Sequence, residues 1–371
     1  MDIYLDDKTS LVLLRTAAVD KDLVLTPADT QAPKALTNKP IRLNRLGIPE
    51  LLGYLSVPQK NSLGIVVPNA QARVRAKGVA CTVCSNLRGS TPFLTLGSVN
   101  GTRRNPIVPG DATVYVQSPA NVVLGMARRL RRMEIERKIN HRQSVLMLVK
   151  LCLELCGTYV HDPFDPHNGS VTFGTEPMLS QAQLMEFLQE EGVEQGLSLT
   201  REAASLAYDL SGSPQESFMG PALFFNSRLG GLHLCDFEAN KALDLSPSQL
   251  ESIGNRTITP DFQLVGYNAV VEYLGAIHEA GDNPRIDHKR SLDYQTLGKR
   301  EFAFWYEDVK TQASFMESAA RIVAMIGQYE GPSIRKRFAR LKNDPDFIGR
   351  QKELFAVFRP WLRDKTVTSS A

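Results

Sequence analysis

The segment from Ser213 to Tyr306 constrains the fold most, because helix-like and strand-like patterns alternate along it. Its Ser213-Pro214 start is typical of a helix, with serine as the N-cap and proline in the first turn, and the glycine pair at 230–231 is expected to end this helix. Further segments follow in order: strands at 257–264 and 269–273, a helix at 285–297, and an aromatic strand at 302–306. Strands that alternate with helices in this way predict an α/β unit with a mixed sheet flanked by helices.

The residues on either side of this segment predict two further regions. Short β-prone runs separated by turn residues lie between residues 63 and 116, and Ser118-Pro119 starts a helix expected to run toward Asn140. After residue 310, helices are expected at 311–326 and 332–342. We therefore expect a smaller α/β region with a basic helix at 1–160, the sheet-containing core at 175–310 and basic C-terminal helices at 311–371.

Composition excludes several classes of protein. The 371 residues are 43% hydrophobic and 22% charged, which is typical of a globular chain rather than a disordered or fibrous one. The apolar helix expected at 144–156 is interrupted by Lys150 and Glu154 and is too short to span a bilayer. The first residues lack the basic and apolar regions of a secretory signal, and five cysteines do not indicate a disulfide framework. We expect a cytoplasmic protein with no membrane partner.

The net charge of only +3 hides two basic segments. Residues 331–365 contain 10 Lys and Arg against 4 Asp and Glu, and residues 127–142 contain 7 against 2. Basic segments on a slightly acidic body are typical of proteins that bind a polyanion such as DNA. The residues expected to contact DNA are Arg128, Arg129, Arg131, Arg132, Arg335, Lys336 and Arg337. Both segments fit equally well as solvated helix faces that meet no ligand.

Two carboxylates in the strand-like segments are the first candidates for a catalytic site. Asp261 follows a proline at the start of one expected strand, and Glu272 follows the apolar run 269–271 of the next. If these strands pair across the turn at Gly266, both carboxylates lie on one side of the sheet. Such oxygen ligands suit Mg²⁺ or Mn²⁺, which can polarise a phosphodiester and activate water. A carboxylate in a buried strand is costly unless it is paired or binds a metal, which favours a functional role for Glu272.

The acidic residues belong to an ordered set of motifs. In chain order these are Ser213-Pro214-Gln215-Glu216, Pro260-Asp261, the run from Glu272 to His278, Asp287-His288-Lys289-Arg290, Gly298, and the aromatic strand with its continuation to Val309. The set resembles the PD-(D/E)XK nuclease superfamily, in particular its Vsr-like (very-short-patch-repair-like) endonuclease-domain branch. The resemblance covers about residues 205–310, less than a third of the chain.

This resemblance implies a restriction-endonuclease-like core that cleaves or nicks DNA with the help of a metal ion. It implies that Asp261 and Glu272 hold the Mg²⁺ and that Glu216 supports the metal or its water. It also implies that His278 contacts the phosphate or assists proton transfer. The helix after these strands adds Lys289 and Arg290 to the residues expected to contact DNA.

One residue departs from the family pattern. The superfamily has lysine at the position of Leu274, and this branch usually has aspartate there. Leucine can neither bind a metal nor orient a water molecule, so the resemblance is also compatible with a nuclease fold that has no catalytic activity. Lys289 on the next helix is a candidate replacement for the missing lysine.

A looser resemblance concerns residues 63–157. The segments that carry it are Val66-Val67-Pro68-Asn69, Arg75-Ala76-Lys77-Gly78-Val79, Val116-Gln117-Ser118-Pro119 and Leu155-Cys156-Gly157-Thr158-Tyr159. They are similar to the middle of AbiEi-like antitoxin-family proteins of bacteria. This resemblance implies a setting in phage defence or toxin–antitoxin control, with a partner protein of such a system.

Structural roles compete with each functional assignment. Residues 213–216 have the spacing of a capping box, in which the glutamate side chain reaches back to the N-cap amide. Asp261 is also typical of a turn, His278 of a loop, and Asp287 with Arg290 of a surface ion pair. Three functions therefore remain open: a metal-dependent endonuclease, a non-catalytic DNA-binding or regulatory protein with a nuclease fold, and a purely structural α/β protein.

Overall fold

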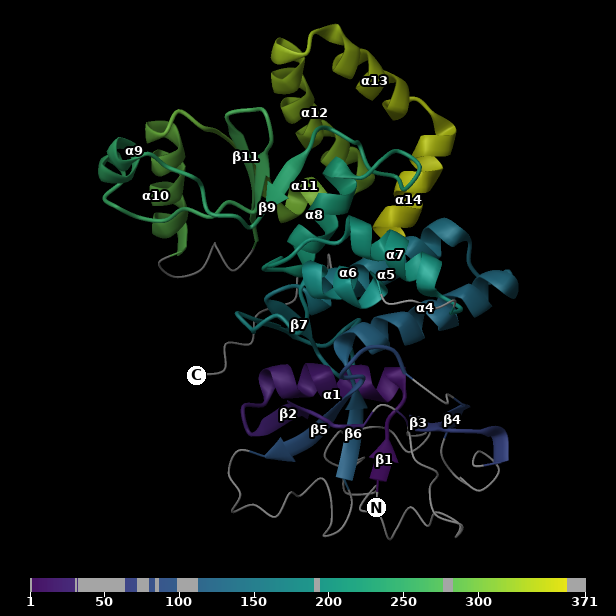
Figure 1. The fold of residues 1–371 in the computed structure, drawn as a ribbon. Coiled ribbons are helices and arrows are strands. Elements are labelled where there is room, and N and C mark those ends of the chain that lie inside the picture. Colours follow the sequence, from purple (N-terminus) through teal and green to yellow (C-terminus); the bar gives the residue numbers. More distant parts are fainter. Residues whose placement is uncertain are drawn as a thin grey trace. The chain divides into compact units, whose positions relative to one another are not determined.

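The structure, a computed structural model, describes residues 2–30, 32, 64–71, 80–83, 87–98, 113–189, 194–275 and 283–358. The chain forms two compact units, Met1–Ile139 with Val160–Ser205, and Asn140–Tyr159 with Leu206–Ala371. Each unit contains a mixed sheet and helices, which confirms the α/β class expected from the sequence (Figure 1). Among the described residues, no helix combines the length and the apolar character needed to cross a membrane.

The first unit is built on a four-stranded sheet. Its strands are β1 (Asp2–Tyr4), β2 (Leu23–Pro27), β5 (Phe93–Ser98) and β6 (Thr113–Gln117). Their order across the sheet is β1-β6-β5-β2, with β1 parallel to β6 and the other pairs antiparallel. The rings of Tyr4 and Tyr115 stack with centroids 4.5 Å apart, and Phe93 packs edge-on against both, so aromatic side chains from three strands hold the sheet together.

Helices and two small sheets complete the first unit. The helices are α1 (Asp7–Val19), α4 (Pro119–Ile135), α6 (Gln181–Gln189) and α7 (Leu197–Leu206). The small sheets pair β3 (Gly64–Val67) with β4 (Ala80–Val83), and β7 (Tyr159–His161) with β8 (Val171–Phe173). Ser118 and a proline in the first turn start α4, as the sequence predicts, although the helix ends at Ile135.

The second unit contains a four-stranded sheet in the order β12-β11-β10-β9. Its strands are β9 (Phe237–Ala239), β10 (Phe262–Leu264), β11 (Ala269–Leu274) and β12 (Arg300–Trp305). The first three form an antiparallel meander, and β12 runs parallel to β11. The sequence predicts three of these strands but misses β9, because three residues without a β-branched side chain give no strand signal.

The helices of this unit are α5 (His141–Leu155), α8 (Pro214–Phe224), α9 (Pro247–Ser252), α10 (Asn283–Thr296), α11 (Tyr306–Val309), α12 (Gln312–Tyr329), α13 (Pro332–Lys342) and α14 (Pro345–Phe358). Helices α8 and α12 cover one face of the sheet. Ring centroids of Phe224 in α8 and Phe262 in β10 are 5.5 Å apart, and those of Phe315 in α12 and Phe304 in β12 are 6.1 Å apart.

The helix that starts at Ser213 is shorter than the sequence suggests. We expected it to continue to the glycine pair at 230–231, but it ends at Phe224. The cause is Asn226, whose side-chain oxygen accepts hydrogen bonds from the amides of Arg228 and Leu229. Such an Asx turn competes with helix continuation and reverses the chain toward β9.

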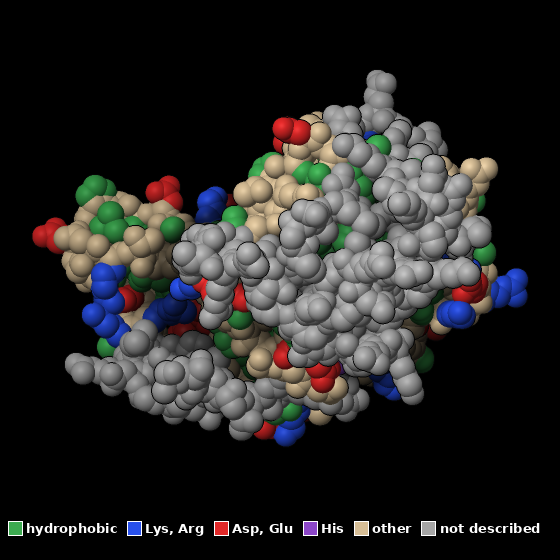
Figure 2. Space-filling view, turned by 90° about the horizontal axis from the view of Figure 1, so that it is seen from below, with side chains coloured by type: hydrophobic (Ala, Val, Ile, Leu, Met, Phe, Trp, Pro, Cys, Tyr) green, Lys and Arg blue, Asp and Glu red, His purple; other side chains and the backbone are tan. Residues whose placement is uncertain are grey.

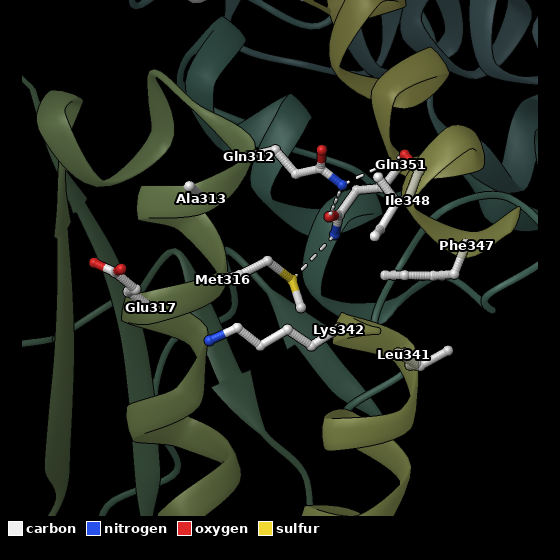
Figure 3. A pocket seen from close by; sticks show the side chains of 9 residues that line it. All are labelled: Gln312, Ala313, Met316, Glu317, Leu341, Lys342, Phe347, Ile348 and Gln351. Atoms are coloured by element: carbon white, nitrogen blue, oxygen red, sulfur yellow. Dashed lines mark hydrogen bonds between the residues drawn. The ribbon is translucent and has the colours of Figure 1, made fainter. Parts of the chain in front are cut away.

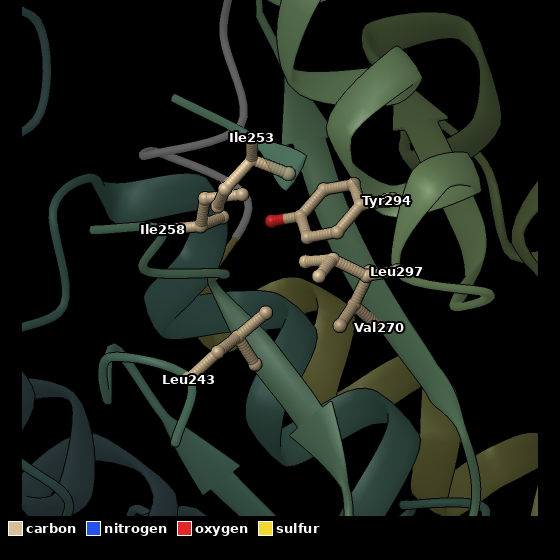
Figure 4. Close-up of a cluster of buried hydrophobic side chains, with 6 residues drawn as sticks. All are labelled: Leu243, Ile253, Ile258, Val270, Tyr294 and Leu297. Atoms are coloured by element: carbon tan, nitrogen blue, oxygen red, sulfur yellow. The ribbon is translucent and has the colours of Figure 1, made fainter. Parts of the chain in front are cut away.

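Helix α10 covers the opposite face of the sheet. Figure 4 shows the hydrophobic cluster on this side, formed by Leu243, Ile253, Ile258, Val270, Tyr294 and Leu297. Val270 and Glu272 are two residues apart on β11, so their side chains point to the same face. The cluster therefore lies beside the Glu272 carboxyl group on this face of the sheet. Tyr294 is part of the cluster, and its hydroxyl contacts Glu272.

Candidate functional site

Sheet pairing brings the two predicted metal ligands together. Phe262 pairs with Val271 and Gln263 with Val270 in the antiparallel β10–β11 register. Continuing that register by one residue places Asp261 directly opposite Glu272, and the two side chains lie on the α10 face of the sheet. Like charges directly opposite each other destabilise a sheet, so this pair needs a shared proton or a cation.

The carboxyl group of Asp261 is enclosed although the residue as a whole keeps partial exposure. Its Oδ2 accepts a hydrogen bond of 2.7 Å from the backbone N–H of Tyr273, and its side chain is hydrogen-bonded to that of Glu272. Burial raises the pKa of Asp261 well above its ordinary value, and the negative charge of Glu216 raises it further. The Tyr273 amide and the Arg290 charge oppose this rise without cancelling it.

Glu272 is almost fully buried, with 1% of its surface exposed. Its Oε1 accepts a hydrogen bond from the Tyr294 hydroxyl, and its Oε2 lies 3.2 Å from Nη1 of Arg290. Burial raises the pKa of Glu272 well above its ordinary value, and repulsion from Asp261 adds to the effect. The partly exposed guanidinium of Arg290 lowers this pKa only in part. Glu272 is thus a buried carboxyl group that holds its proton readily.

The third predicted carboxylate, Glu216, has both a structural and an electrostatic role. It lies in the first turn of α8, where its amide donates to the hydroxyl of the N-cap Ser213. Its carboxylate accepts hydrogen bonds of 2.7 Å from the Gly212 amide and 2.9 Å from the Ser213 hydroxyl. In a capping box this side chain would accept from the backbone amide of the N-cap Ser213, but here it accepts from the amide of the preceding residue, Gly212. Burial raises the pKa of Glu216 to about 7, and the charge of Glu272 contributes to the rise.

Two residues that the sequence did not single out also face this site. Tyr294 lies one helical turn after Arg290 on α10, so i,i+4 spacing could have identified it. Asn240 follows β9 and adopts a left-handed backbone with φ of 49°. Its buried side-chain nitrogen lies close enough to lower the pKa of Glu216, but it has no hydrogen-bond partner among the described residues. No sequence signal marks Asn240, because β9 itself was not recognised.

The remaining predicted residues of the motif differ in their placement. Leu274 is buried in β11, two residues beyond Glu272 and on the same face, so it occupies the position where the family has a polar group. Lys289 is exposed on α10. His278 lies outside the described residues, and its predicted role stays a prediction.

The oxygen donors of the Asp261–Glu272 pair form a small donor set for a metal ion. Among the described residues, no group of three or more His, Cys, Asp and Glu side chains has the arrangement of a metal site. Asp261 and Glu272 nevertheless offer two opposed oxygen ligands, whose pKa values are raised first by burial and then by the negative charge of neighbouring carboxylates. Mg²⁺ commonly binds through one or two carboxylates, with water and phosphate oxygens completing its coordination. The pair therefore fits Mg²⁺ or Mn²⁺ as a two-carboxylate site, without Glu216 as a direct ligand.

The arginines of α4 that were predicted to contact DNA all have acidic partners. The ion pairs join Arg128 to Glu194, Arg129 to Asp6 and Asp7, Arg131 to Glu134, and Arg132 to Glu136. Asp6 caps α1 and Asp7 begins it, and both are buried, so Arg129 stabilises the start of a helix. These pairs reduce the positive charge that α4 presents to a ligand.

The predicted cations of the second unit have a different environment. Arg335 and Arg337 of α13 donate to the backbone carbonyls of Ala324 and His233, and Lys336 is exposed. On α10, exposed Lys289 lies beside Arg290, which pairs with Glu272. Figure 2 shows the molecule from below, where Lys and Arg side chains gather beside acidic ones over the lobe labelled α9 and α10 in Figure 1.

Comparisons with known proteins identify no relative, since the chain matches no protein-family model, no curated protein and no solved structure.

Proposed function

We propose that this protein is a metal-dependent endonuclease that cleaves or nicks DNA at the Asp261–Glu272 pair. One observation carries the proposal: two carboxyl groups face each other across adjacent strands, enclosed by protein, and their pKa values are raised. Repulsion of this kind is unfavourable for stability and is relieved when a divalent cation binds. Perturbed carboxyl groups that converge at one end of a sheet are typical of functional sites.

Each residue of the site has a role that follows from its contacts. Asp261 and Glu272 would hold the cation, and the Tyr273 amide and the Tyr294 hydroxyl keep their carboxylates oriented. When bound, Mg²⁺ or Mn²⁺ would polarise a phosphodiester and lower the pKa of a coordinated water molecule. With a pKa of about 7, Glu216 can accept a proton from water near neutral pH.

Two nitrogen donors are suited to the phosphate group. The side-chain nitrogen of Asn240 is buried beside Glu216 and can donate to a phosphate oxygen or to a water molecule. Arg290 neutralises part of the charge on Glu272, and its partly exposed guanidinium can also reach a ligand in solvent. Such preorganised donors stabilise the charge that develops on a phosphate during cleavage.

The order of elements supports the same proposal. Along the chain, Glu216 starts a helix, Asp261 and Glu272 lie on paired strands, and Arg290 lies on a helix before the last strand. This is the order that the resemblance to Vsr-like endonuclease domains implies. The looser resemblance to AbiEi-like proteins supports a setting in phage defence, with a partner protein of that system.

A second candidate function follows from one residue. Buried Leu274 lies where a catalytic lysine or aspartate is expected, and it offers neither charge nor hydrogen bond to a water molecule. This favours a non-catalytic protein with a nuclease fold that binds DNA or regulates a partner. In that case Asp261 and Glu272 would be present but would not catalyse DNA cleavage.

Plasmid nicking separates the two functions. Purified protein with Mg²⁺ or Mn²⁺ should convert supercoiled plasmid to open circles, and Asp261→Asn or Glu272→Gln should slow this by about 100-fold or more, because each removes a charge that holds the cation. Glu251→Gln on exposed α9 is the matched control and should leave the rate unchanged. Absence of nicking by the wild type with either metal, while DNA binding persists, would favour the non-catalytic function.

A further inference from the structure

The helix α13 carries a concentration of positive charge that the described structure does not neutralise. It contains Arg335, Lys336, Arg337, Arg340 and Lys342 and no acidic residue. None of these cations forms an ion pair with a carboxylate in the described part of the chain. The four arginines at 128–132 of α4, in contrast, each pair with at least one carboxylate. The two basic segments thus look alike in sequence but differ in the charge that they present to solvent.

The apolar face of α13 is already used within the protein. Ile334 and Leu341, at the i,i+7 spacing of one helix face, are only 3% and 7% exposed. No apolar stripe is therefore left to enter a lipid surface, which a membrane-binding amphipathic helix requires. The exposed face carries Arg335, Lys336 and Arg340. This combination fits a polyanion that is recognised by charge alone.

One cation of α13, Lys342, lines a cavity instead of the exposed face that carries Arg335, Lys336 and Arg340. Figure 3 shows Lys342 extending toward α12, beside Met316 and Glu317, along a cavity of about 210 Å³ between α12, α13 and α14. Gln351 is among the residues that line this cavity, and its side chain accepts a hydrogen bond of 2.7 Å from Gln312. We therefore do not expect Lys342 to contact a ligand that binds the exposed face of α13.

The position of α13 separates it from the carboxyl pair. Arg337 donates to the carbonyl of His233, and the ring of Tyr329 at the end of α12 packs 5.7 Å from that of Tyr267 in the β10–β11 turn. Asp261 lies at the other end of β10, four residues before Val265, which corresponds to about 14 Å along an extended strand. A ligand that contacts α13 is thus bound away from the proposed chemistry.

We propose that α13 binds the phosphate backbone of double-stranded DNA, as a surface distinct from the Asp261–Glu272 site, and that the α4 arginines do not. The choice of DNA rests on the proposed function, but the surface itself requires no cleavage. The 11 residues of α13 extend about 16 Å, which equals the rise of about five base pairs. Contacts to phosphates from arginine and lysine carry little sequence preference, so binding is expected to be non-specific and sensitive to salt.

The test is fluorescence anisotropy with a labelled 30-base-pair duplex, in EDTA so that binding is measured without cleavage. The triple variant Arg335→Gln, Lys336→Gln, Arg340→Gln should bind at least about 10-fold more weakly at about 50 mM salt, and the slope of log Kd against log salt should fall by roughly 3. The matched control changes Arg228, Lys241 and Lys310 to glutamine, which removes the same charge from the same unit and should alter Kd by less than about twofold. Equal melting curves for both proteins establish that each is folded.

Three results would overturn the proposal. The first is equal weakening by the two triple variants, which would mean that only net charge matters. The second is weakening by Arg132→Gln, an exposed α4 arginine, as large as that of the α13 variant. The third is no duplex binding at about 50 mM salt together with binding to poly-glutamate, which would assign α13 to an acidic protein partner.

Failure of this inference and failure of the proposed function are distinguishable. If neither the wild type nor the variants nick plasmid but the α13 variant loses duplex binding, the α13 proposal is supported and the endonuclease proposal is refuted. If the wild type nicks plasmid and the α13 variant binds and nicks equally well, the endonuclease stands and the α13 surface falls. Asp261→Asn should bind the duplex like the wild type, because it leaves α13 unchanged.

Discussion

The buried carboxyl groups predict that this protein loses stability as the pH rises, and Glu216 gives the effect a magnitude. Burial raises its pKa from an ordinary 4.5 to about 7. A carboxyl group whose pKa is raised by folding contributes a stability that is complete below the unfolded pKa and is lost as the pH rises through the folded pKa. Between pH 5 and pH 8.5, the ionisation of Glu216 alone should lower the unfolding free energy by roughly 2 to 3 kcal/mol. Asp261 and Glu272 shift in the same direction and should increase this loss.

The perturbation that isolates Glu216 is its replacement by glutamine. The amide cannot ionise, so the part of the pH dependence that belongs to Glu216 disappears. The variant also loses one of two accepted hydrogen bonds, from Gly212 or Ser213, at a cost of about 1 kcal/mol that does not depend on pH. Near pH 5 the glutamate of the unfolded wild type is already mostly ionised, which lowers the wild-type stability by about 1 kcal/mol and offsets this loss, so Glu216→Gln should match the wild type there. At pH 8.5 the variant should be more stable by about 2 kcal/mol.

Urea unfolding in EDTA, followed by tryptophan fluorescence at pH 5, 6, 7 and 8.5, measures this directly. Both tryptophans of the chain, Trp305 and Trp361, come after residue 300, so the signal reports the part of the chain that includes β12. Glu251→Gln on exposed α9 is the control and should keep the wild-type slope. A wild-type stability that is flat or rises from pH 5 to pH 8.5, or a Glu216→Gln protein with the wild-type slope, would refute the reasoning.

Four further outcomes are expected. Mg²⁺ at millimolar concentration should stabilise the protein more at pH 8.5 than at pH 5 in the urea assay run without EDTA, because its ligands must be ionised, and Asp261→Asn should abolish that difference. Leu274→Lys should increase plasmid nicking, since it adds a group that can orient water beside Glu272. An unchanged nicking rate would show that Leu274 is not what limits catalysis. Tyr294→Phe should destabilise the protein by about 1 to 2 kcal/mol, because the buried Glu272 carboxyl loses a donor, and thermal melting would detect it. Gly220→Ala should destabilise by about 1 to 3 kcal/mol instead of gaining about 1 kcal/mol of helix propensity, because the new Cβ would lie 2.3 Å from the Tyr208 hydroxyl; an unchanged melting temperature would contradict this.

The site shows which properties local sequence could anticipate. Pairing of the strands at Asp261 and Glu272 follows from two short apolar runs around a turn at Gly266, where φ is 82°. The start of α8 follows from the N-cap Ser213 and the proline after it. Caps, turns and apolar runs act over a few residues, so they can be read without knowledge of the fold.

Other features depend on residues that the sequence keeps far apart. Arg129 and Asp6 are 123 positions apart in the sequence. Because of their ion pair, Arg129, which the sequence predicts to contact DNA, instead stabilises the start of α1. Strands β1 and β2 carry no motif, and they become strands because β6 and β5 offer them free edges. Pairing across such separations is set by the whole fold, and local propensity does not report it.

The sequence by itself determined the α/β class, the identity of the carboxylates and the order of α8, β10, β11, α10, β12, α12 and α13 in the second unit, because caps and apolar periodicity are local signals. Only the tertiary structure decided that Tyr294 and Asn240 face those carboxylates and that Leu274 is buried beside Glu272. It also decided that α13 rather than α4 retains its positive charge. Burial and charge pairing depend on distances through space, and these are fixed only when the strands and helices pack together.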